Sequence, residues 1–165
     1  AWEVDYVEQP FATDDLASHA RLRDEMVASV ALDEPIDSAA AAIRAIEAGA
    51  CDLLVVKPSR VGLAASLAIH DLALAAGIRI KASGLLETEI GRASTLAVAT
   101  LPGATHSDIA PSSWYMTGGI GGSQADPAAG SITPCRHPGI GFIPDPNTFA
   151  PNVVREAPFG PRPET

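Results

Sequence analysis

Residues 51–60, with the sequence CDLLVVKPSR, indicate the fold class of this chain. The run DLLVV at 52–56 is continuously apolar after its first residue, without the alternation expected of a strand with one face in water. Such a run is typical of a parallel strand that is buried on both faces of a sheet. It ends at Lys57, and Pro58 holds that lysine in an extended conformation. A positive charge is therefore expected at the end of a buried strand.

The same order of strand, turn and helix continues on both sides of this stretch. Apolar patterning predicts strands at 4–7, 28–32, 52–56, 78–82 and, more weakly, 105–109. It predicts helices at 14–26, 39–48, 63–76 and 88–101. Asp37 or Ser38 can cap the helix at 39–48, which Gly49 then ends. Strands that alternate with helices of this length are parallel and are joined by right-handed crossovers.

Two α/β architectures fit this pattern: a doubly wound open sheet and a (β/α)8 barrel of the TIM type. Open-sheet nucleotide folds usually carry a glycine-rich first turn, whereas the turns here read EQPFATDD, DEPIDS, KPSRVG and SGLLET. Functional groups at several successive strand ends are typical of barrels, so a partial barrel is predicted. With five strands and four helices, residues 1–110 are expected to be the C-terminal part of a barrel domain. Residues 111–165 are expected to be an irregular tail rich in glycine and proline, disordered at 155–165.

Composition limits the possible partners. The net charge is −9 and the sequence offers no basic patch, which argues against binding to nucleic acid. No apolar run reaches the roughly 18–20 residues of a membrane span, so no membrane partner is expected. Cys51 and Cys135 are too few for a disulfide framework, which makes the reducing cytoplasm the expected location.

Three polar residues stand at the ends of successive predicted strands. Glu8 and Asp33 are 25 residues apart, and Lys57 follows Asp33 by 24 residues. This spacing matches one strand-plus-helix unit, so the three groups are expected at one end of a parallel sheet. Two carboxylates beside an amine favour a divalent cation, Mg²⁺ or Mn²⁺, next to a lysine that transfers protons.

Alternatives remain for each of these residues. A single strand-end carboxylate is also explained by a helix cap or a surface charge. Lys57 is also compatible with a Schiff base or with a lysine whose stem covers apolar surface. Glu34 adjoins Asp33 but points elsewhere on period-two geometry, so a supporting role beside the site is expected. Arg60 fits either the orientation of an anionic substrate or a surface salt bridge.

The motifs VEQP, LDEP, VVKPSRVG and SGLLETEIGRA resemble successive strand-end motifs of the enolase superfamily, in its muconate-lactonizing subgroup. Within this subgroup the chain is most similar to o-succinylbenzoate synthases and N-acylamino acid racemases. The likeness extends from about Val7 to Asp108. It implies that Glu8 and Asp33 are the second and third metal ligands, that the metal is Mg²⁺ or Mn²⁺, and that Lys57 is a catalytic lysine.

The resemblance also implies a substrate pocket for a small carboxylate. The loop after the seventh barrel strand and the segment after the eighth would line it, which assigns substrate contacts to Ser83, Gly84, Leu85, Glu87, Asp108 and Ile109. The family's first metal aspartate, its Lys-x-Lys motif and its capping domain would lie upstream of this chain. Lys81 stands where relatives often carry an aromatic residue, and its role is open, as is that of His106.

The implied chemistry is removal of a proton α to a carboxylate. A lyase of the o-succinylbenzoate synthase type, in menaquinone biosynthesis, would then expel water, whereas an N-acylamino acid or dipeptide racemase would return the proton on the other face. Two further alternatives are an incomplete barrel without activity and a half-barrel that completes itself as a homo-oligomer. His19, His70 and His137 are expected to be surface or packing residues.

Overall fold

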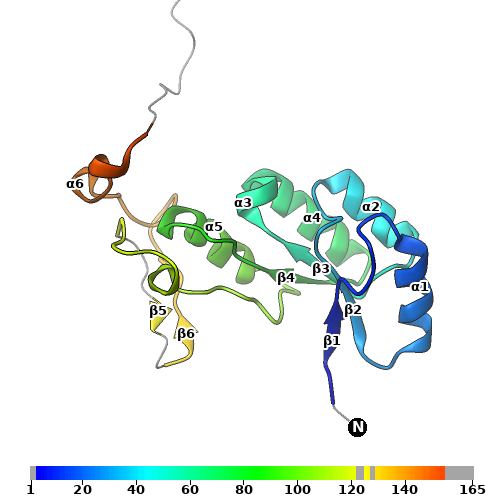
Figure 1. Cartoon of the computed structure of the whole chain (residues 1–165). Coiled ribbons are helices and arrows are strands. Elements are labelled where there is room, and N and C mark those ends of the chain that lie inside the picture. Colours follow the sequence, from blue (N-terminus) through cyan, green and yellow to red (C-terminus); the bar gives the residue numbers. More distant parts are fainter. Residues whose placement is uncertain (1–2, 122–124, 127–128, 155–165) are drawn as a thin grey trace, which may run out of the picture.

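The computed structural model describes residues 3–121, 125–126 and 129–154 of the chain (Figure 1). The strands of the main sheet are β1 (Tyr6–Glu8), β2 (Ser29–Leu32), β3 (Leu53–Val56) and β4 (Arg79–Ala82). The helices that follow them are α1 (Leu16–Glu25), α2 (Ala39–Glu47), α3 (Pro58–Val61), α4 (Leu63–Ala75) and α5 (Glu89–Ala99). Four of the five helices lie within two residues of the predicted ranges, and α3 was not predicted.

The four strands form one parallel sheet in the order β1-β2-β3-β4. In the register, Glu8 lies opposite Ala31, Ala31 opposite Leu53, and Leu53 opposite Arg79. Each strand is joined to the next through helical structure, as parallel pairing requires. The predicted α/β class is therefore confirmed.

The weak strand predicted at 105–109 is not a regular strand. This segment follows β4 through two isolated parallel bridges, Ile80 with Ala104 and Ser83 with Asp108. His106 has a φ of 50°, in the left-handed region, and this conformation interrupts the extended backbone between the two bridges. The chain thus keeps the position of a fifth strand without its continuous ladder.

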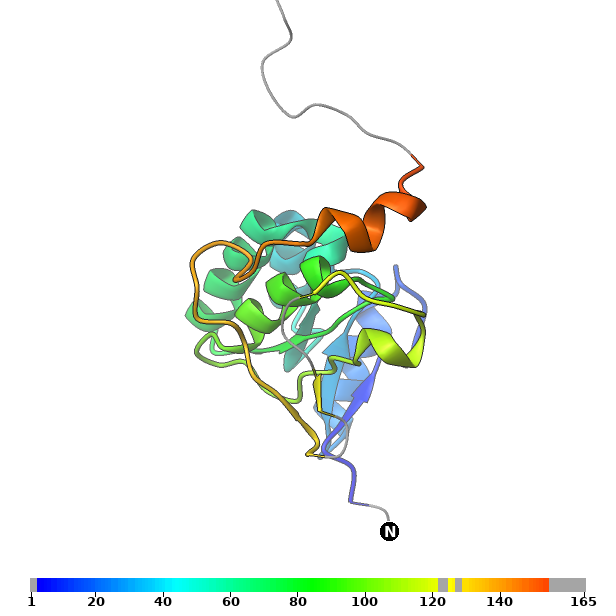
Figure 2. The same cartoon turned by 90° about the vertical axis from the view of Figure 1, so that its left-hand side faces the viewer.

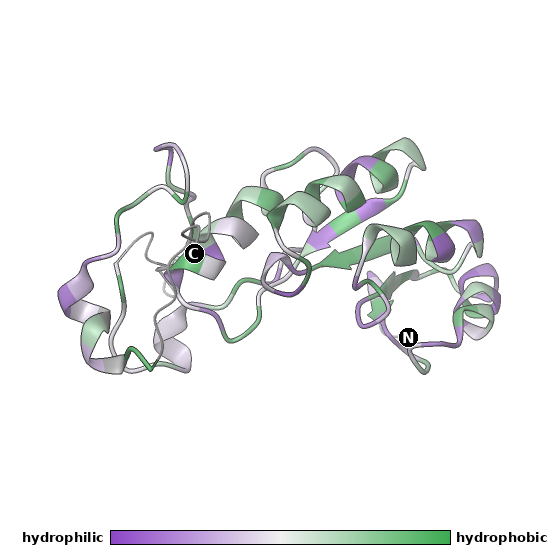
Figure 3. Cartoon of the chain, turned by 90° about the horizontal axis from the view of Figure 1, so that it is seen from above, coloured by the Kyte–Doolittle hydropathy of each residue, from purple (hydrophilic) through white to green (hydrophobic). Residues whose placement is uncertain are grey.

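The two faces of the sheet differ in what covers them. The larger core cluster includes Leu32, Leu54, Val56 and Ile80 together with helix residues such as Ile69, and all five are at most 1% exposed. The opposite face carries a small cluster of Ala31, Leu53 and Val55, with Tyr6 packed against it. Figure 3 shows green, hydrophobic ribbon in the strands and in the helices beside them, interrupted by purple, hydrophilic residues. Helices therefore cover one face, and the side chains of the candidate site described below lie on the other.

Local sequence explains where the helices begin and end. The Asp15 side chain accepts a hydrogen bond from the Ser18 amide at 2.9 Å, and Ser38 caps α2 through the Ala41 amide at 3.2 Å. Gly49, just after α2, has a φ of 63°, which a glycine adopts without strain. Asp15 and Ser38 therefore mark where α1 and α2 begin, and Gly49 marks where α2 ends.

The C-terminal segment has little regular structure. It contains the 3₁₀ helices Ser112–Trp114 (η1) and Ala150–Asn152 (η2), a hairpin of β5 (Ala125–Asp126) and β6 (Ser131–Ile132), and α6 (Pro146–Phe149). In Figure 2 this segment, yellow to orange, runs beside α5. The disorder expected at 155–165 lies outside the described residues, and the division into barrel part and tail stays a prediction. None of the helices in the described ranges has the length and apolarity needed to cross a bilayer.

Candidate active site

Asp33 lies at the centre of a cluster of charges at the carboxyl end of β2. Its side chain is 7% exposed, and its Oδ2 accepts a hydrogen bond from the Lys57 ammonium at 2.5 Å. The Arg60 guanidinium donates to Oδ1 and to the backbone carbonyl of the same residue, both at 2.9 Å. The structure therefore brings together three of the residues that the sequence singles out.

The turn after β3 explains why two cations reach one carboxylate. Lys57 is the N-cap of α3 and has extended backbone angles, and Pro58 occupies the first helical turn. Arg60 comes three residues after Lys57, about one turn further along this short helix. A buried carboxylate needs compensating positive charge, and this turn supplies two cations, Lys57 and Arg60.

Glu8 has a different partner, which the sequence does not reveal. Lys81 extends from β4, with its side chain 6% exposed, and donates to Glu8 Oε2 at 2.8 Å and to the Tyr6 hydroxyl at 3.0 Å. Its nitrogen also lies 5.2 Å from the centre of the Tyr6 ring. Burial alone lowers the pKa of Lys81, but the bonds to Glu8 and Tyr6 outweigh it and raise the pKa above its ordinary value.

Gln9 joins the two carboxylate residues and was missed by the sequence reasoning. Its Oε1 accepts a hydrogen bond from the Asp33 amide at 3.1 Å, and its φ of 43° is rare for a residue other than glycine. Its Nε2 donates to the Phe11 carbonyl at 3.1 Å and lies 3.4 Å from Nε2 of the fully buried His19. Gln9 therefore fixes the end of β1 against the end of β2.

The loop after β4 lies beside the Lys57 turn. The Gly84 amide donates to the Asp108 carbonyl at 2.9 Å, and Ser83 is buried. Glu87 is also buried, and its carboxylate accepts hydrogen bonds from Ser59 and from Thr95. It therefore links the α3 turn to α5.

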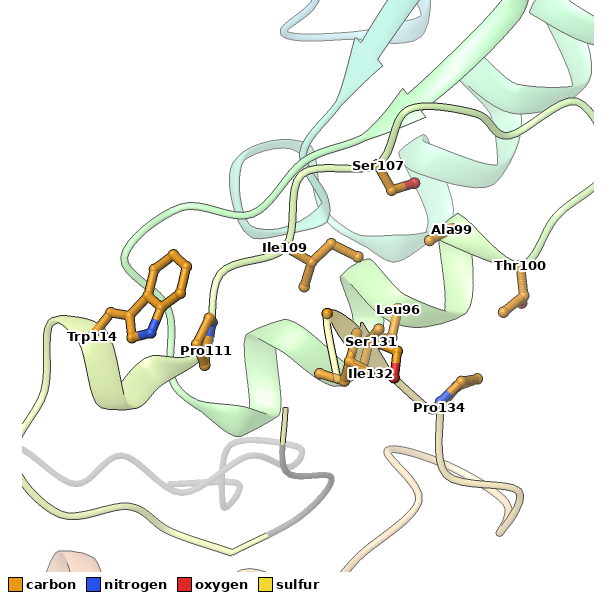
Figure 4. A pocket seen from close by; sticks show the side chains of 11 residues that line it. Leu96, Ala99, Thr100, Ser107, Ile109, Pro111, Trp114, Ser131, Ile132 and Pro134 are labelled. Atoms are coloured by element: carbon orange, nitrogen blue, oxygen red, sulfur yellow. The ribbon is translucent and has the colours of Figure 1, made fainter. Parts of the chain in front are cut away.

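The remaining candidates lie at the edge of the cluster or outside it. Glu34 and Leu85 are exposed. The His106 ring contacts Tyr6 edge to face, with ring centres 5.3 Å apart. Ile109 lines a separate cavity of about 440 Å³ between α5 and residues 130–134 (Figure 4). That cavity includes neither carboxylate of the site nor Lys57, so its position is distinct from that of the charged cluster.

The donor chemistry of the cluster fits a hard divalent cation in part. Glu8 and Asp33 offer oxygen ligands from neighbouring strand ends, the ligand type that Mg²⁺ prefers. In the part of the chain that the structure describes, no three His, Cys, Asp or Glu side chains form a metal-binding group. Both carboxylates also carry cationic partners from the chain itself. The described residues thus supply two ligands and not a complete set.

Comparison with known proteins shows the family to which the chain belongs. The family model for the enolase C-terminal domain-like fold matches residues 1–148. The chain belongs to the enolase C-terminal domain-like family. Its parallel strands and crossover helices therefore form part of an enolase-type (β/α)8 barrel, as the sequence predicts.

Relatives of known activity fall into two groups within this enolase family. An N-succinylamino acid racemase of Thermus thermophilus is 46% identical over 114 residues, covering 68% of this chain and 31% of the relative. An o-succinylbenzoate synthase of Bacillus subtilis is 39% identical over 137 residues, covering 82% of this chain and 37% of the relative. The chain thus spans about a third of the length of these relatives.

Solved structures show the same fold. A member of the enolase superfamily from Listeria innocua superposes with a TM-score of 0.79 at 27% identity, covering 89% of this chain and 40% of that one. A further member from Enterococcus faecalis superposes with a TM-score of 0.78 at 28% identity, covering 90% of this chain and 41% of that one.

Proposed function

We propose that the protein containing this chain is a Mg²⁺-dependent lyase of the o-succinylbenzoate synthase type. It would remove a proton α to a carboxylate of a small substrate and eliminate water through an enediolate. The observation that carries the proposal is the contact of Lys57 with Asp33 at the carboxyl ends of β2 and β3, in a chain whose relatives include o-succinylbenzoate synthases. The reaction would belong to menaquinone biosynthesis in the cytoplasm.

The residues of the cluster divide this chemistry among them. Glu8 and Asp33 would hold a divalent cation together with a ligand from outside this chain. When bound, the cation supplies positive charge where the substrate carboxylate gains its second negative charge. Lys57 would move the proton or stabilise the enediolate, depending on which face of the substrate reacts. Arg60 holds the Asp33 carboxylate in place through its hydrogen bond to Oδ1.

A second candidate is an N-acylamino acid or dipeptide racemase. The 46% identity to the N-succinylamino acid racemase of Thermus thermophilus favours it. The same cluster serves both reactions, because each begins with the removal of a proton α to a carboxylate. Only the fate of the enediolate differs: loss of water in the lyase, reprotonation in the racemase.

A third candidate is an incomplete, non-catalytic barrel. The cluster supplies two carboxylate ligands, and the chain spans about a third of its curated relatives. Residues 1–165 alone are therefore expected to bind Mg²⁺ weakly and to turn over neither substrate. Association of two half-barrels would appear as a discrete dimer in light scattering.

One assay separates the three candidates. The protein with any flanking sequence is incubated with Mg²⁺ and either the cyclohexadiene substrate of the synthases or an N-succinyl amino acid. Dehydration of the first supports the lyase, and racemisation of the second without dehydration of the first supports the racemase. Absence of both reactions supports the non-catalytic barrel.

A further inference from the structure

The Lys81 ammonium donates a hydrogen bond to one carboxylate oxygen of Glu8, a candidate metal ligand. It lies 2.8 Å from Glu8 Oε2, while the Tyr6 hydroxyl accepts a second hydrogen bond from it at 3.0 Å. Lys81 and Glu8 belong to β4 and β1, the two outer strands of the four-stranded sheet, so the lysine reaches across β2 and β3. Its side chain is 6% exposed and that of Glu8 is 30% exposed. The Lys81 side chain is therefore more buried than that of Glu8.

The charges of the cluster do not favour a divalent cation as they stand. Glu8 and Asp33 carry two negative charges, whereas Lys57, Arg60 and Lys81 carry three positive charges in direct contact with them. Lys57 and Arg60 both contact Asp33, but Lys81 alone of these three contacts Glu8. A cation that binds Glu8 must therefore meet the charge of Lys81 at close range, where Coulomb repulsion is weakly screened.

We propose that Lys81 is the counter-ion of Glu8 in the metal-free site and competes with a divalent cation for that carboxylate. The inference rests on the proposed function, because it takes Glu8 to be a metal ligand. Lys81 then acts as a positioning residue that sets the metal affinity of the site. In the metal-free site Lys81 holds the Glu8 side chain in place, and its charge opposes the binding of a divalent cation.

The test compares Mn²⁺ binding to the full chain, measured by electron paramagnetic resonance, in the wild type and in Lys81→Met. Methionine keeps an unbranched apolar stem and removes the charge. The variant is expected to bind Mn²⁺ about tenfold more tightly, a change that corresponds to ~1.4 kcal/mol. Lys81→Arg keeps the charge and is expected to bind within twofold of the wild type.

Two controls isolate the contact with Glu8. Arg79 is a cation on the same strand whose guanidinium donates to Ser29 at 2.8 Å, so Arg79→Met removes equal charge without touching Glu8. It is expected to leave Mn²⁺ affinity within twofold. In a Glu8→Gln background, Lys81→Met is expected to give no tightening. If the thermal melt shows that Lys81→Met does not fold, Lys81→Gln takes its place with the same expected tightening.

The proposal is overturned if the Lys81 variant binds Mn²⁺ no more tightly than the wild type, including the case in which neither binds. Equal tightening in Arg79→Met, or tightening that survives in the Glu8→Gln background, also overturns it. The readout is binding and not turnover. It is therefore independent of the turnover assay described for the proposed function. Tighter Mn²⁺ binding in Lys81→Met by a protein that shows no turnover in that assay would contradict the proposed function alone. Turnover by a protein whose Mn²⁺ affinity is the same in Lys81→Met would contradict this inference alone.

Discussion

The ammonium nitrogen of Lys57 lies 2.5 Å from Oδ2 of Asp33, although 24 residues separate them in the sequence. The pair joins the ends of two neighbouring parallel strands, β2 and β3. It is also largely buried, with the two side chains 13% and 7% exposed. Coulomb attraction is stronger between buried charges than at the surface. The Lys57 ammonium and the Asp33 carboxylate therefore hold each other in place at the carboxyl ends of the two strands.

Replacement of Lys57 tests its role in proton transfer. Lys57→Met is expected to lower kcat/KM of the full-length protein by about 10²–10⁴-fold, the usual contribution of a general acid or base. Arg60 still compensates Asp33 in this variant, so the fold is expected to persist. Steady-state kinetics with a circular dichroism spectrum measure both effects. A loss smaller than tenfold in a folded variant speaks against a catalytic Lys57.

Gln9 is expected to stabilise the site through its contacts with the backbone. Gln9→Ala removes the acceptor for the buried Asp33 amide and the donor to the Phe11 carbonyl. The expected loss is about 1–3 kcal/mol in the free energy of unfolding, because a buried amide loses its partner. Urea denaturation measures this loss. A stability unchanged within about 0.5 kcal/mol contradicts the assigned contact.

Glu89 is expected to make the contact between α5 and the C-terminal segment pH-dependent. Burial raises the pKa of this carboxyl, but hydrogen bonds from Ser112 and the Ile120 amide, together with Arg92, outweigh it and hold the pKa below its ordinary value of 4.5. A depressed folded-state pKa contributes stability above the unfolded value, and this contribution is lost as pH falls through the folded-state pKa.

The matching experiment compares the free energy of unfolding of the wild type and Glu89→Gln at pH 7 and below pH 4.5. The wild type is expected to lose more stability on acidification than the variant does. Equal losses in the two proteins contradict a stabilising charge at this position.

The two thiols are expected to differ in reactivity. Burial raises the pKa of Cys51 to about 12, whereas Cys135 is exposed. The thiolate is the reactive form. A thiol reagent at pH 8 is therefore expected to modify Cys135 quickly and Cys51 only after denaturation. Cys135→Ser removes the fast phase. Two equally fast phases in the native wild type contradict the burial of Cys51.

The sequence predicts most of the barrel elements because their signals are local. Continuous apolar runs such as LLVV at 53–56 indicate buried parallel strands, and Ser38 and Gly49 mark the limits of α2. The segment at 105–109 differs because the positive φ of His106 breaks the ladder, and a single sequence does not reveal such a conformation. The four-residue helix α3 is too short to show a periodic pattern.

The site is predictable where it follows from spacing and not where it depends on contacts across the sheet. Nearly equal intervals identify Asp33 and Lys57, which the structure brings into contact. The pairing of Lys81 with Glu8 depends on the register of four strands and on a long side chain that crosses two of them. Sequence marks Lys81 only as an unusual residue. The strained backbone of Gln9 has no local signal either.

The most direct test of the proposed chemistry is proton nuclear magnetic resonance of the full-length protein with Mg²⁺ in D₂O, using the cyclohexadiene substrate and an N-succinyl amino acid. Loss of the α-proton from at least one compound, with dehydration of the first as the main reaction, is expected in the wild type. The loss is expected to slow by about 10²-fold or more in Lys57→Met and in Glu8→Gln. An unchanged α-proton signal in both compounds, or exchange within tenfold of the wild-type rate in folded Lys57→Met, would contradict an enolase-type active site built on Glu8, Asp33 and Lys57.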